Sequence, residues 1–265
     1  MAKVVYIGGY GRSGSTLLEY LMTANPKLVA CGEVASCWRK KLTLSNTCTC
    51  GRSVQQCSVW HVFFGAKNAT HWTHLDLSLA LLEQISTDFE LMVDSSKTAW
   101  GATAMPFKLR QKLGNNFHLI HVVRDPRAVC WSLIQSKKKH AVFSNPALRC
   151  IWTTLAWGIA NLSCECFHWL HPDQYVRVHY EDLARRPGDV LNDLFKKLLP
   201  NAPWGLERIG SNDNRHQLHG NRMRKQSLSL NSVREDLRWR KEMPLGLCRL
   251  VAALTRPMRA RYGYA

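Results

Sequence analysis

A glycine-rich turn near the start of the chain carries the clearest chemical signal. The apolar residues 4–7 lead directly into the run Gly8-Gly9-Tyr10-Gly11-Arg12-Ser13-Gly14-Ser15-Thr16, and a helical pattern follows over 17–22. A buried strand, a glycine-rich loop and a helix N-terminus together form an anion site, because backbone N–H groups point inward and the helix dipole favours negative charge. The alternative interpretation is a tight glycine turn without a ligand.

This loop differs from a nucleotide-binding P-loop at one position. Gly9 and Gly14 have the P-loop spacing, but Ser15 stands where that motif has its lysine. The lysine normally reaches the β- and γ-phosphates of a nucleoside triphosphate. We therefore expect a phosphate ligand that is not a nucleoside triphosphate, with Arg12 supplying the positive charge.

Arg124 and Ser132 predict a second anion pocket. Arg124 follows the strand predicted over 117–123, and Ser132 lies in the helix that Asp125 caps and Pro126 begins. An arginine and a hydroxyl that face one crevice suit a phosphate group, because a guanidinium binds phosphate through two parallel hydrogen bonds. Read alone, the Arg-Asp-Pro segment is also compatible with an ordinary helix start.

The elements that must position these residues alternate along the chain. Strand patterns cover 4–7, 90–93, 117–123 and 175–180, with a short apolar piece at 28–30, and helical patterns cover 17–22, 75–89, 102–113, 147–170, 188–199 and 234–256. This alternation predicts an α/β fold with a P-loop-like parallel sheet flanked by helices on both faces. Ligands of such sheets bind at the carboxyl ends of the strands, where the glycine loop, residues 94–97, Arg124 and residues 180–182 lie.

Length and charge limit the classes of protein and partner. The 265 residues fit one domain spanning 1–265, with a cysteine-rich loop at about 45–60 and a C-terminal lid at about 205–244. The 36 Lys and Arg against 19 Asp and Glu give a net charge of +17, which indicates an anionic partner such as nucleic acid, a membrane surface or a charged small ligand. We see no signal peptide and no apolar stretch of membrane-spanning length, so we expect a cytoplasmic protein.

The cysteines need a separate interpretation. Cys48, Cys50 and Cys57 form a local cluster in a polar loop, flanked by Cys37 and His61, whereas most of the other cysteines sit singly in apolar runs. Zinc sites usually contain a Cys-x-x-Cys pair, and no fourth ligand is evident in the sequence. We therefore favour free thiols or a disulfide-stapled loop over a metal site, and we expect the reaction to need no metal.

Four segments together resemble sulfotransferases that use 3′-phosphoadenosine 5′-phosphosulfate (PAPS) as donor. They are Gly-Arg-Ser-Gly-Ser-Thr-Leu-Leu at 11–18, Arg-Asp-Pro-Arg-Ala-Val-Cys-Trp-Ser-Leu at 124–133, Tyr-Glu-Asp-Leu at 180–183 and His-Gly-Asn-Arg-Met-Arg at 219–224. The resemblance covers about residues 3–245. It is to the soluble bacterial members and, through Gly32-Glu33, to tyrosylprotein sulfotransferases.

The resemblance implies roles for the donor-binding residues. The 5′-phosphosulfate would be held by Gly11, Arg12, Ser13, Gly14, Ser15 and Thr16, and the 3′-phosphate by Arg124 and Ser132. Tyr180 matches a tyrosine that contacts the donor, although it also fits a buried tyrosine at a strand end. A loop over the 3′-phosphate end would contribute Asn221, Arg222 and Arg224, with Trp239 and Lys241 in the same lid. Arg222 departs from the family pattern, where proline is common.

The resemblance also points to catalytic residues. Glu33 matches the Gly-Glu of the tyrosylprotein branch and is our candidate base for the acceptor, with Arg12 and Lys97 stabilising the charge of the leaving phosphate and sulfuryl groups. Arg12 stands where many cytosolic sulfotransferases carry lysine. Glu33 could instead be an ordinary helix N-terminal charge, and Lys97 a surface lysine. His121 and His219 are the alternative bases, although His121 also fits a hydrogen-bonded core histidine.

Function is therefore predicted to be sulfuryl transfer from PAPS, with adenosine 3′,5′-bisphosphate (PAP) as product. The acceptor would be a hydroxyl, or less often an amine, of a small molecule, carbohydrate or lipid. The sequence leaves the oligomeric state open, and a homo-oligomer is one of the alternatives. The alternatives are a P-loop kinase or other NTPase, which Ser15 disfavours, and a basic nucleic-acid-binding protein, which the charge alone would allow.

Overall fold

The structure is a computed structural model of the whole chain. It describes residues 2–39, 46–65, 72–99, 101–136, 145–209, 214–219 and 233–264, and the structural statements below concern these ranges.

A parallel sheet forms the centre of the molecule. Within the described ranges it has five strands in the order β2-β3-β1-β4-β5, and every neighbouring pair is parallel. The strands are β1 (Lys3–Gly8), β2 (Leu28–Ala30), β3 (Leu91–Asp94), β4 (Phe117–Val123) and β5 (Tyr175–His179). The chain leaves β1 toward one edge of the sheet and later continues from β4 toward the other edge. The loops after β1 and β4 therefore diverge at a topological switch point, which is where α/β sheets bind ligands.

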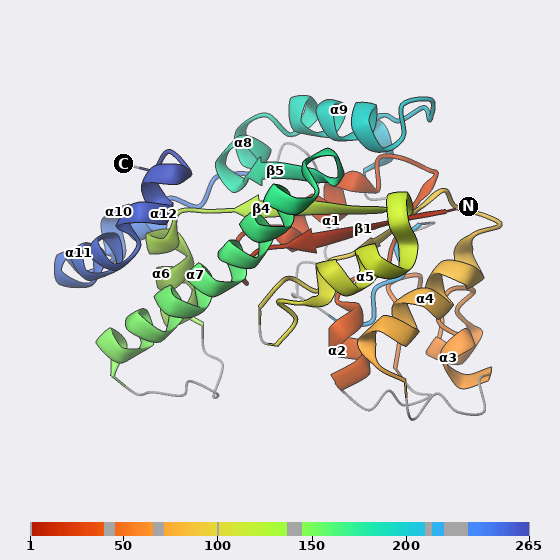
Figure 1. The fold of residues 1–265 in the computed structure, drawn as a ribbon, viewed down its shortest axis with the longest axis horizontal. Helices are drawn as coiled ribbons and strands as arrows, with labels where there is room; N and C mark the ends of the chain where they lie inside the picture. Colours follow the sequence, from red (N-terminus) through yellow and green to blue (C-terminus); the bar gives the residue numbers. More distant parts are fainter. Residues whose placement is uncertain are drawn as a thin grey trace.

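Helices cover both faces of this sheet, which confirms the predicted fold class (Figure 1). Along β1, Val5 and Ile7 pack with α1, α8 and α9, whereas Val4 and Tyr6 face the side of α4, α5 and α7, as the period of two requires. The helices are α1 (Ser15–Met22), α2 (Val34–Arg39), α3 (Val62–Gly65), α4 (His74–Ile85), α5 (Met105–Leu113), α6 (Pro126–Ile134), α7 (Pro146–Leu170), α8 (Tyr180–Arg185), α9 (Pro187–Leu198), α10 (Arg238–Glu242), α11 (Leu245–Leu254) and α12 (Arg256–Arg261).

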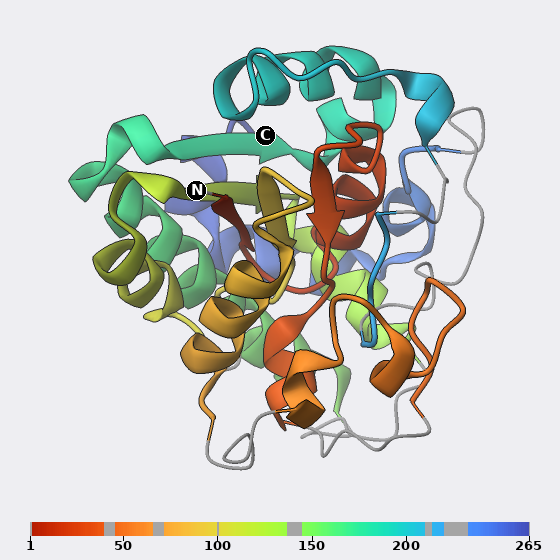
Figure 2. The same cartoon turned by 90° about the vertical axis from the view of Figure 1, so that its right-hand side faces the viewer.

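The apolar piece at 28–30, which we grouped with the strand patterns, is the edge strand β2, and its register against β3 is maintained over Leu28–Ala30. One local prediction needs correction. Tyr180, which we predicted as the last strand residue, is instead the first residue of α8. Within the predicted lid at about 205–244, residues 214–219 run beside β2 (Figure 2). Ala30 donates its N–H to the Asn214 carbonyl at 2.9 Å and accepts from His216 N–H at 2.8 Å.

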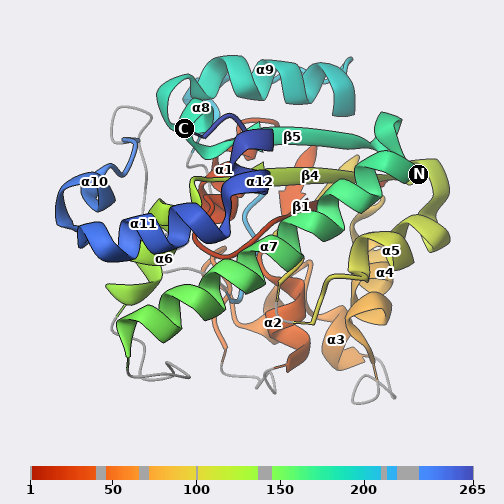
Figure 3. The same cartoon turned by 60° about the vertical axis from the view of Figure 1, so that its left-hand side comes forward.

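The long helix α7 packs only one of its faces. Its buried side includes Trp157, Cys164 and Phe167, so it is a core helix along that side. The opposite side exposes large apolar groups at intervals of three, four or seven residues, namely Leu148, Trp152, Leu155, Ile159, Leu162 and Trp169. Its N-terminal half lies beside α6 and α11, which gather with α10 and α12 near the carboxyl end of β4 (Figure 3). Among the described residues, no helix has the length and apolar character needed to cross a membrane.

A buried carboxyl group joins three of the segments that surround the carboxyl ends of the strands. Glu19 of α1 is 1% exposed and accepts hydrogen bonds from Gly32 N–H at 2.6 Å and from the Ser95 hydroxyl at 2.8 Å. Gly32 immediately precedes Glu33, and Ser95 lies two residues before Lys97. Burial raises the pKa of Glu19 to about 7, because the low-dielectric interior disfavours its charged form.

This pKa shift predicts a pH-dependent loss of stability. A carboxyl whose folded-state pKa lies above its unfolded value of 4.5 destabilises the fold progressively as the pH rises from about 4.5 to 7. In Glu19→Gln the amide oxygen can still accept from Gly32 N–H and the amide nitrogen can donate to Ser95. We expect the wild type to lose roughly 2 to 3 kcal/mol more unfolding free energy than Glu19→Gln between pH 5 and pH 8.

Urea unfolding at the two pH values measures this difference. Glu90→Gln is the matched control, because the Glu90 side chain is 57% exposed and its removal should leave the pH dependence of the wild type in place. An equal pH dependence of wild type and Glu19→Gln would mean that the buried carboxyl does not titrate in this range.

Candidate active site

The loop between β1 and α1 has a backbone that only particular residues tolerate. Gly9 and Gly14 have φ angles of 106° and 96°, and added Cβ atoms would lie 2.4 Å from the Val122 carbonyl oxygen and 2.6 Å from the Tyr180 ring. Arg12 also has a positive φ of 70°, although it is not glycine. Such a conformation costs an L-residue about 1–2 kcal/mol and persists only where the surroundings hold it.

Arg124 holds that strained loop from the end of β4. Its Nη1 donates to the Arg12 carbonyl at 3.0 Å and its Nη2 donates to the Asp236 carbonyl at 3.1 Å. The guanidinium lies over the Tyr180 ring, 4.1 Å from its centroid. The Arg124 side chain therefore points toward the glycine loop, and Tyr180 is a buried platform between the loop and this guanidinium.

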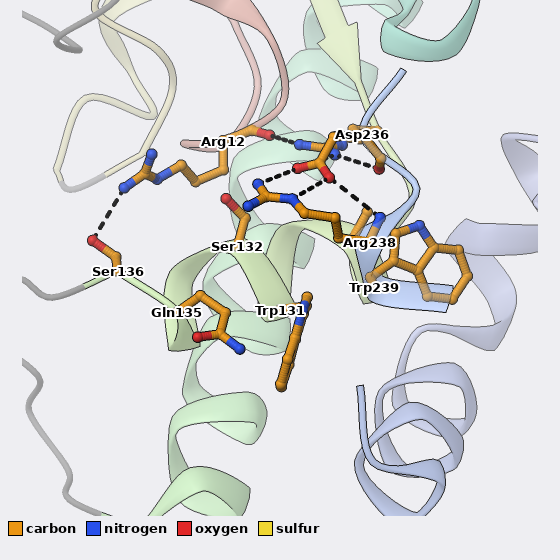
Figure 4. A pocket seen from close by; sticks show the side chains of 10 residues that line it. Arg12, Trp131, Ser132, Gln135, Ser136, Asp236, Arg238 and Trp239 are labelled. Carbon is orange, nitrogen blue, oxygen red and sulfur yellow. Dashed lines mark hydrogen bonds and ion pairs between the residues drawn. The ribbon is translucent and has the colours of Figure 1, made fainter. Parts of the chain in front are cut away.

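A cavity of about 200 Å³ opens beside these residues and brings together three predicted donor-binding groups (Figure 4). Arg12, Arg124 and Ser132 all line it, and Arg12 donates from Nη2 to the Ser136 hydroxyl at 3.1 Å. Burial and the like charge of Arg124 lower the pKa of Arg12. Two guanidinium groups that face one cavity are an electrostatic site for an anion, because a bound negative charge relieves their repulsion.

Two buried polar atoms in this region are poised for a further partner. The Ser13 hydroxyl, in a residue 1% exposed, and the Arg124 Nε have no hydrogen-bond partner within the described part of the chain. Buried polar atoms normally have such partners, so each one calls for an explanation. Their positions, one in the glycine loop and one at the end of β4, fit a ligand with two anionic groups.

Sequence reasoning missed two charged residues of the cavity, Asp236 and Arg238. Asp236 lines it with its carboxylate 3.6 Å from Arg124 Nη2, and it accepts two hydrogen bonds from Arg238 at 2.8 and 2.9 Å (Figure 4). The bonds from Arg238, more than the nearby charge of Arg124, lower the pKa of Asp236 to about 2. Asp236 falls within the predicted lid, but only the fold shows that its carboxylate meets Arg124.

The other residues predicted in the lid differ in where they lie. Trp239 lines the cavity, whereas Lys241 lies on α10 and is exposed. The three residues predicted to cover the 3′-phosphate, Asn221, Arg222 and Arg224, lie outside the described residues.

The three predicted catalytic side chains do not all share this cavity. Glu33 and Lys97 form an ion pair, with 2.6 Å between Oε1 and Nζ, and do not line the cavity that Arg12 does. Lys97 is 5% exposed, so it is not a surface lysine, and its φ of 70° is the second strained non-glycine conformation in the described chain. Glu33 precedes α2 and accepts a hydrogen bond from the Ser36 hydroxyl at 2.9 Å.

The glycine loop connects this ion pair to the cavity that Arg12 lines. The Lys97 N–H donates to the Ile7 carbonyl at 3.1 Å, and Gly9 N–H donates to the Thr98 hydroxyl at 3.0 Å. The segment after β3 therefore lies directly against the start of the loop. Glu33 and Lys97 stand on the β3 side of that loop, and Arg124 stands on its β4 side.

The structure separates the two alternative histidines. His121 is fully buried in β4, and its ring nitrogens lie 2.7 Å from the Tyr175 hydroxyl and 2.7 Å from Asn161 Oδ1. Burial lowers the pKa of His121 to about 4, so it is a neutral core histidine. His219 lies close to the candidate base through its backbone, because its carbonyl accepts from Glu33 N–H at 3.5 Å.

Comparisons with known proteins agree with this geometry. The sulfotransferase family profile matches residues 5–200. Protein-tyrosine sulfotransferase 1 of Danio rerio is 26% identical over 278 residues, covering 98% of this chain and 72% of that protein. Among solved structures, the sulfotransferase domain from the curacin biosynthetic pathway aligns with a TM-score of 0.60 at 21% identity, covering 97% of both chains. A sulfotransferase from Alicyclobacillus acidocaldarius aligns with a TM-score of 0.57 at 13% identity, covering 97% of this chain and 92% of that one. These solved structures establish the fold, and the family match over most of the length shows that the chain belongs to the sulfotransferase family.

Proposed function

We propose that this sulfotransferase moves a sulfuryl group from PAPS to a hydroxyl acceptor. The observation that carries the proposal is the convergence of Arg12, Arg124 and Ser132 on one cavity beside a glycine loop. A donor with separate 3′- and 5′-anionic groups needs two anion-binding positions, and the glycine loop and the Arg124 side of the cavity would provide them. Membership of the sulfotransferase family favours this reading over the kinase and nucleic-acid alternatives.

The glycine loop would bind the 5′-phosphosulfate. Its backbone leads into the N-terminus of α1 at Ser15, where unpaired amides favour an anion. The buried Ser13 hydroxyl would donate to a phosphate oxygen, which supplies the partner that it lacks among the described residues. Gly11, Gly14 and Thr16 would complete the cradle, as the resemblance implies.

Arg124 and Ser132 would bind the 3′-phosphate. The Arg124 guanidinium already uses Nη1 and Nη2 for two carbonyl oxygens, and its Nε remains without a described partner. A phosphate in the cavity would replace the 3.6 Å contact with the Asp236 carboxylate, which keeps its bonds to Arg238. The Tyr180 ring, which lies against the Arg124 guanidinium, would hold that guanidinium in position.

The ion pair on the other side of the loop would act on the acceptor. Bound PAPS supplies a sulfuryl group whose bond to the 5′-phosphate oxygen breaks as the acceptor oxygen attacks sulfur. Glu33 would take the proton of the acceptor hydroxyl at a carboxylate oxygen, and its contact with Lys97 Nζ would hold the carboxylate in position. Lys97 and Arg12 would balance the negative charge on the sulfuryl and phosphate oxygens.

Acceptor identity is best addressed by a direct screen. The Danio rerio relative is named for its action on protein tyrosine, and this supports a hydroxyl as the acceptor group. Labelled PAPS should be offered with a tyrosyl peptide, simple phenols, sugars and lipid alcohols. Transfer to at least one hydroxyl acceptor is the expected outcome, whereas label transfer to amines alone would replace the hydroxyl assignment.

Binding of PAP and 5′-AMP tests the proposed 3′-phosphate pocket. PAP should raise the melting temperature of the wild type, because it binds the folded state.

Ser132→Ala should weaken PAP binding at least roughly tenfold, because it removes a hydrogen bond to a charged group. Binding of 5′-AMP should stay unchanged in the same variant, since 5′-AMP has no 3′-phosphate. Calorimetric titration of both nucleotides measures the contrast, and an equal loss for both would remove Ser132 from the 3′-phosphate site.

Another prediction concerns the base. Glu33→Gln should lower kcat by roughly 100-fold or more while the Kd of PAP changes little, because general base catalysis contributes about 10²–10⁴. Glu90→Gln is the control for loss of one surface carboxylate. Turnover is measured with the acceptor that the screen identifies. Full activity in Glu33→Gln would transfer the role of base to a histidine, with His219 the nearer of the two.

A further inference from the structure

Three cysteines and one histidine meet in a cluster that the proposed reaction does not use. The Sγ atoms of Cys48, Cys50 and Cys57 and the ring nitrogen of His216 all lie within 4.8 Å of one another. His216 Nδ1 is 3.2 Å from Cys57 Sγ and 4.0 Å from Cys48 Sγ, and the Sγ atoms of Cys50 and Cys57 are 3.9 Å apart. Cys48, Cys57 and His216 are buried, and Cys50 is half-buried.

These separations match the edges of a tetrahedral metal site. Zinc binds sulfur at about 2.3 Å and imidazole nitrogen at about 2.0–2.1 Å, which puts its ligand atoms roughly 3.5–3.8 Å apart. A disulfide would need an S–S distance of about 2.05 Å. No two cysteine sulfurs in the described residues are joined in this way.

Local structure explains how the loop gathers its three sulfurs. Gly51, with φ 86°, completes a tight turn in which Gly51 N–H donates to the Cys48 carbonyl at 3.0 Å. This turn brings Cys48 and Cys50 to one side although only one residue separates them. The short 3-10 turn over Val54–Gln56 then returns the chain, so that Cys57 faces the same point.

His216 arrives from a distant segment that is itself fixed in place. It lies 159 residues after Cys57, in the segment 214–219 that runs beside β2 and the loop of residues 46–60 (Figure 2). Thr49 links the two segments, because its hydroxyl donates to the Arg215 carbonyl at 2.8 Å and accepts from Gln217 N–H at 2.8 Å. Trp60 Nε1 donates to the His216 carbonyl at 2.5 Å. Such hydrogen bonds orient a ligand before a metal binds.

We propose that Cys48, Cys50, Cys57 and His216 bind one structural zinc ion. Four protein ligands complete the coordination of zinc and leave no position for water or substrate, so the site is structural and not catalytic. A Cys₃His set of this geometry is typical of zinc and unlike the oxygen-rich sites of magnesium or calcium. The two flanking residues of the sequence motif do not take part: His61 Nδ1 contacts the Cys57 carbonyl, and Cys37 packs in the core.

The zinc ion would fix one wall of the candidate active site. The segment that carries His216 continues to His219, whose carbonyl accepts from the N–H of Glu33. Gly32, with φ 75°, lies so close to this segment that an added Cβ would be 3.0 Å from the His219 carbonyl oxygen. This structural role of zinc is independent of the donor and the acceptor, because the metal only holds the cysteine loop against the segment 214–219.

Metal content of the intact chain tests the proposal directly. We expect one zinc per chain by elemental analysis after purification with zinc under reducing conditions, and less than 0.1 in Cys57→Ser and His216→Ala. Cys166→Ser should keep one zinc, because Cys166 is a half-buried cysteine of α7 outside the cluster. Cys50→Ser is the mildest ligand variant, since Cys50 is only half-buried, and it should bind zinc at least tenfold more weakly.

Cobalt substitution in the wild-type chain gives a second measurement that does not require any variant to fold. Co²⁺ should bind with a stoichiometry of one and produce the intense visible bands of a tetrahedral site, with thiolate-to-cobalt charge-transfer bands in the near ultraviolet. Wild-type protein that retains no zinc and shows no such bands on Co²⁺ titration would overturn the proposal. A disulfide within the cluster, found by mass spectrometry in protein kept under reductant, would also overturn it.

Discussion

The hydrogen bond from Arg124 to the Arg12 carbonyl is the contact on which the anion-binding region depends. Because β1 and β4 are neighbours and parallel, their carboxyl ends meet, and the loop after one strand lies within reach of the first side chain after the other. Arg12 adopts a left-handed conformation that turns its carbonyl toward Arg124. One bond therefore joins the glycine loop to Arg124, the two places where we propose that the 5′ and 3′ anionic groups of the donor bind.

The other half of the site depends on a buried carboxyl group. Glu19 reaches from α1 to the segments after β2 and β3, and those segments carry Glu33 and Lys97. The helix that starts at the glycine loop is thus also the support of the candidate catalytic pair. The burial is costly when Glu19 is charged, but the same carboxyl joins α1 to the segments after β2 and β3.

Much of this arrangement could be predicted from sequence because it depends on local patterns. The strand, glycine loop and helix of residues 3–22 are contiguous, and parallel strand order alone places Arg124 and Ser132 near Arg12. The family resemblance is confirmed by the match over residues 5–200. The edge strand β2 has a weaker sequence signal, since three apolar residues form only a short pattern.

The rest depends on contacts between distant parts of the chain. His216 could not be paired with the cysteine loop from spacing, because 159 residues separate it from Cys57 and only the register beside β2 brings them together. Nothing in the sequence around Asp236 distinguishes it from other acidic residues. Its role becomes visible only in the fold, where its carboxylate lies 3.6 Å from Arg124 Nη2. His121 is the opposite example. Its residue type suggested a catalytic base, but the structure shows a core histidine with both ring nitrogens in hydrogen bonds.

Asp236 gives the cavity an internal counter-ion, and this has a consequence for selectivity. Under the proposed function, a phosphate that binds beside Arg124 would displace the Asp236 carboxylate from its 3.6 Å contact, which would offset part of the electrostatic gain from the guanidinium groups. A nucleotide that is already anchored at the glycine loop presents its second phosphate at a high effective concentration and can win that exchange. The carboxylate would thereby favour ligands that carry both anionic groups on one molecule over free phosphate.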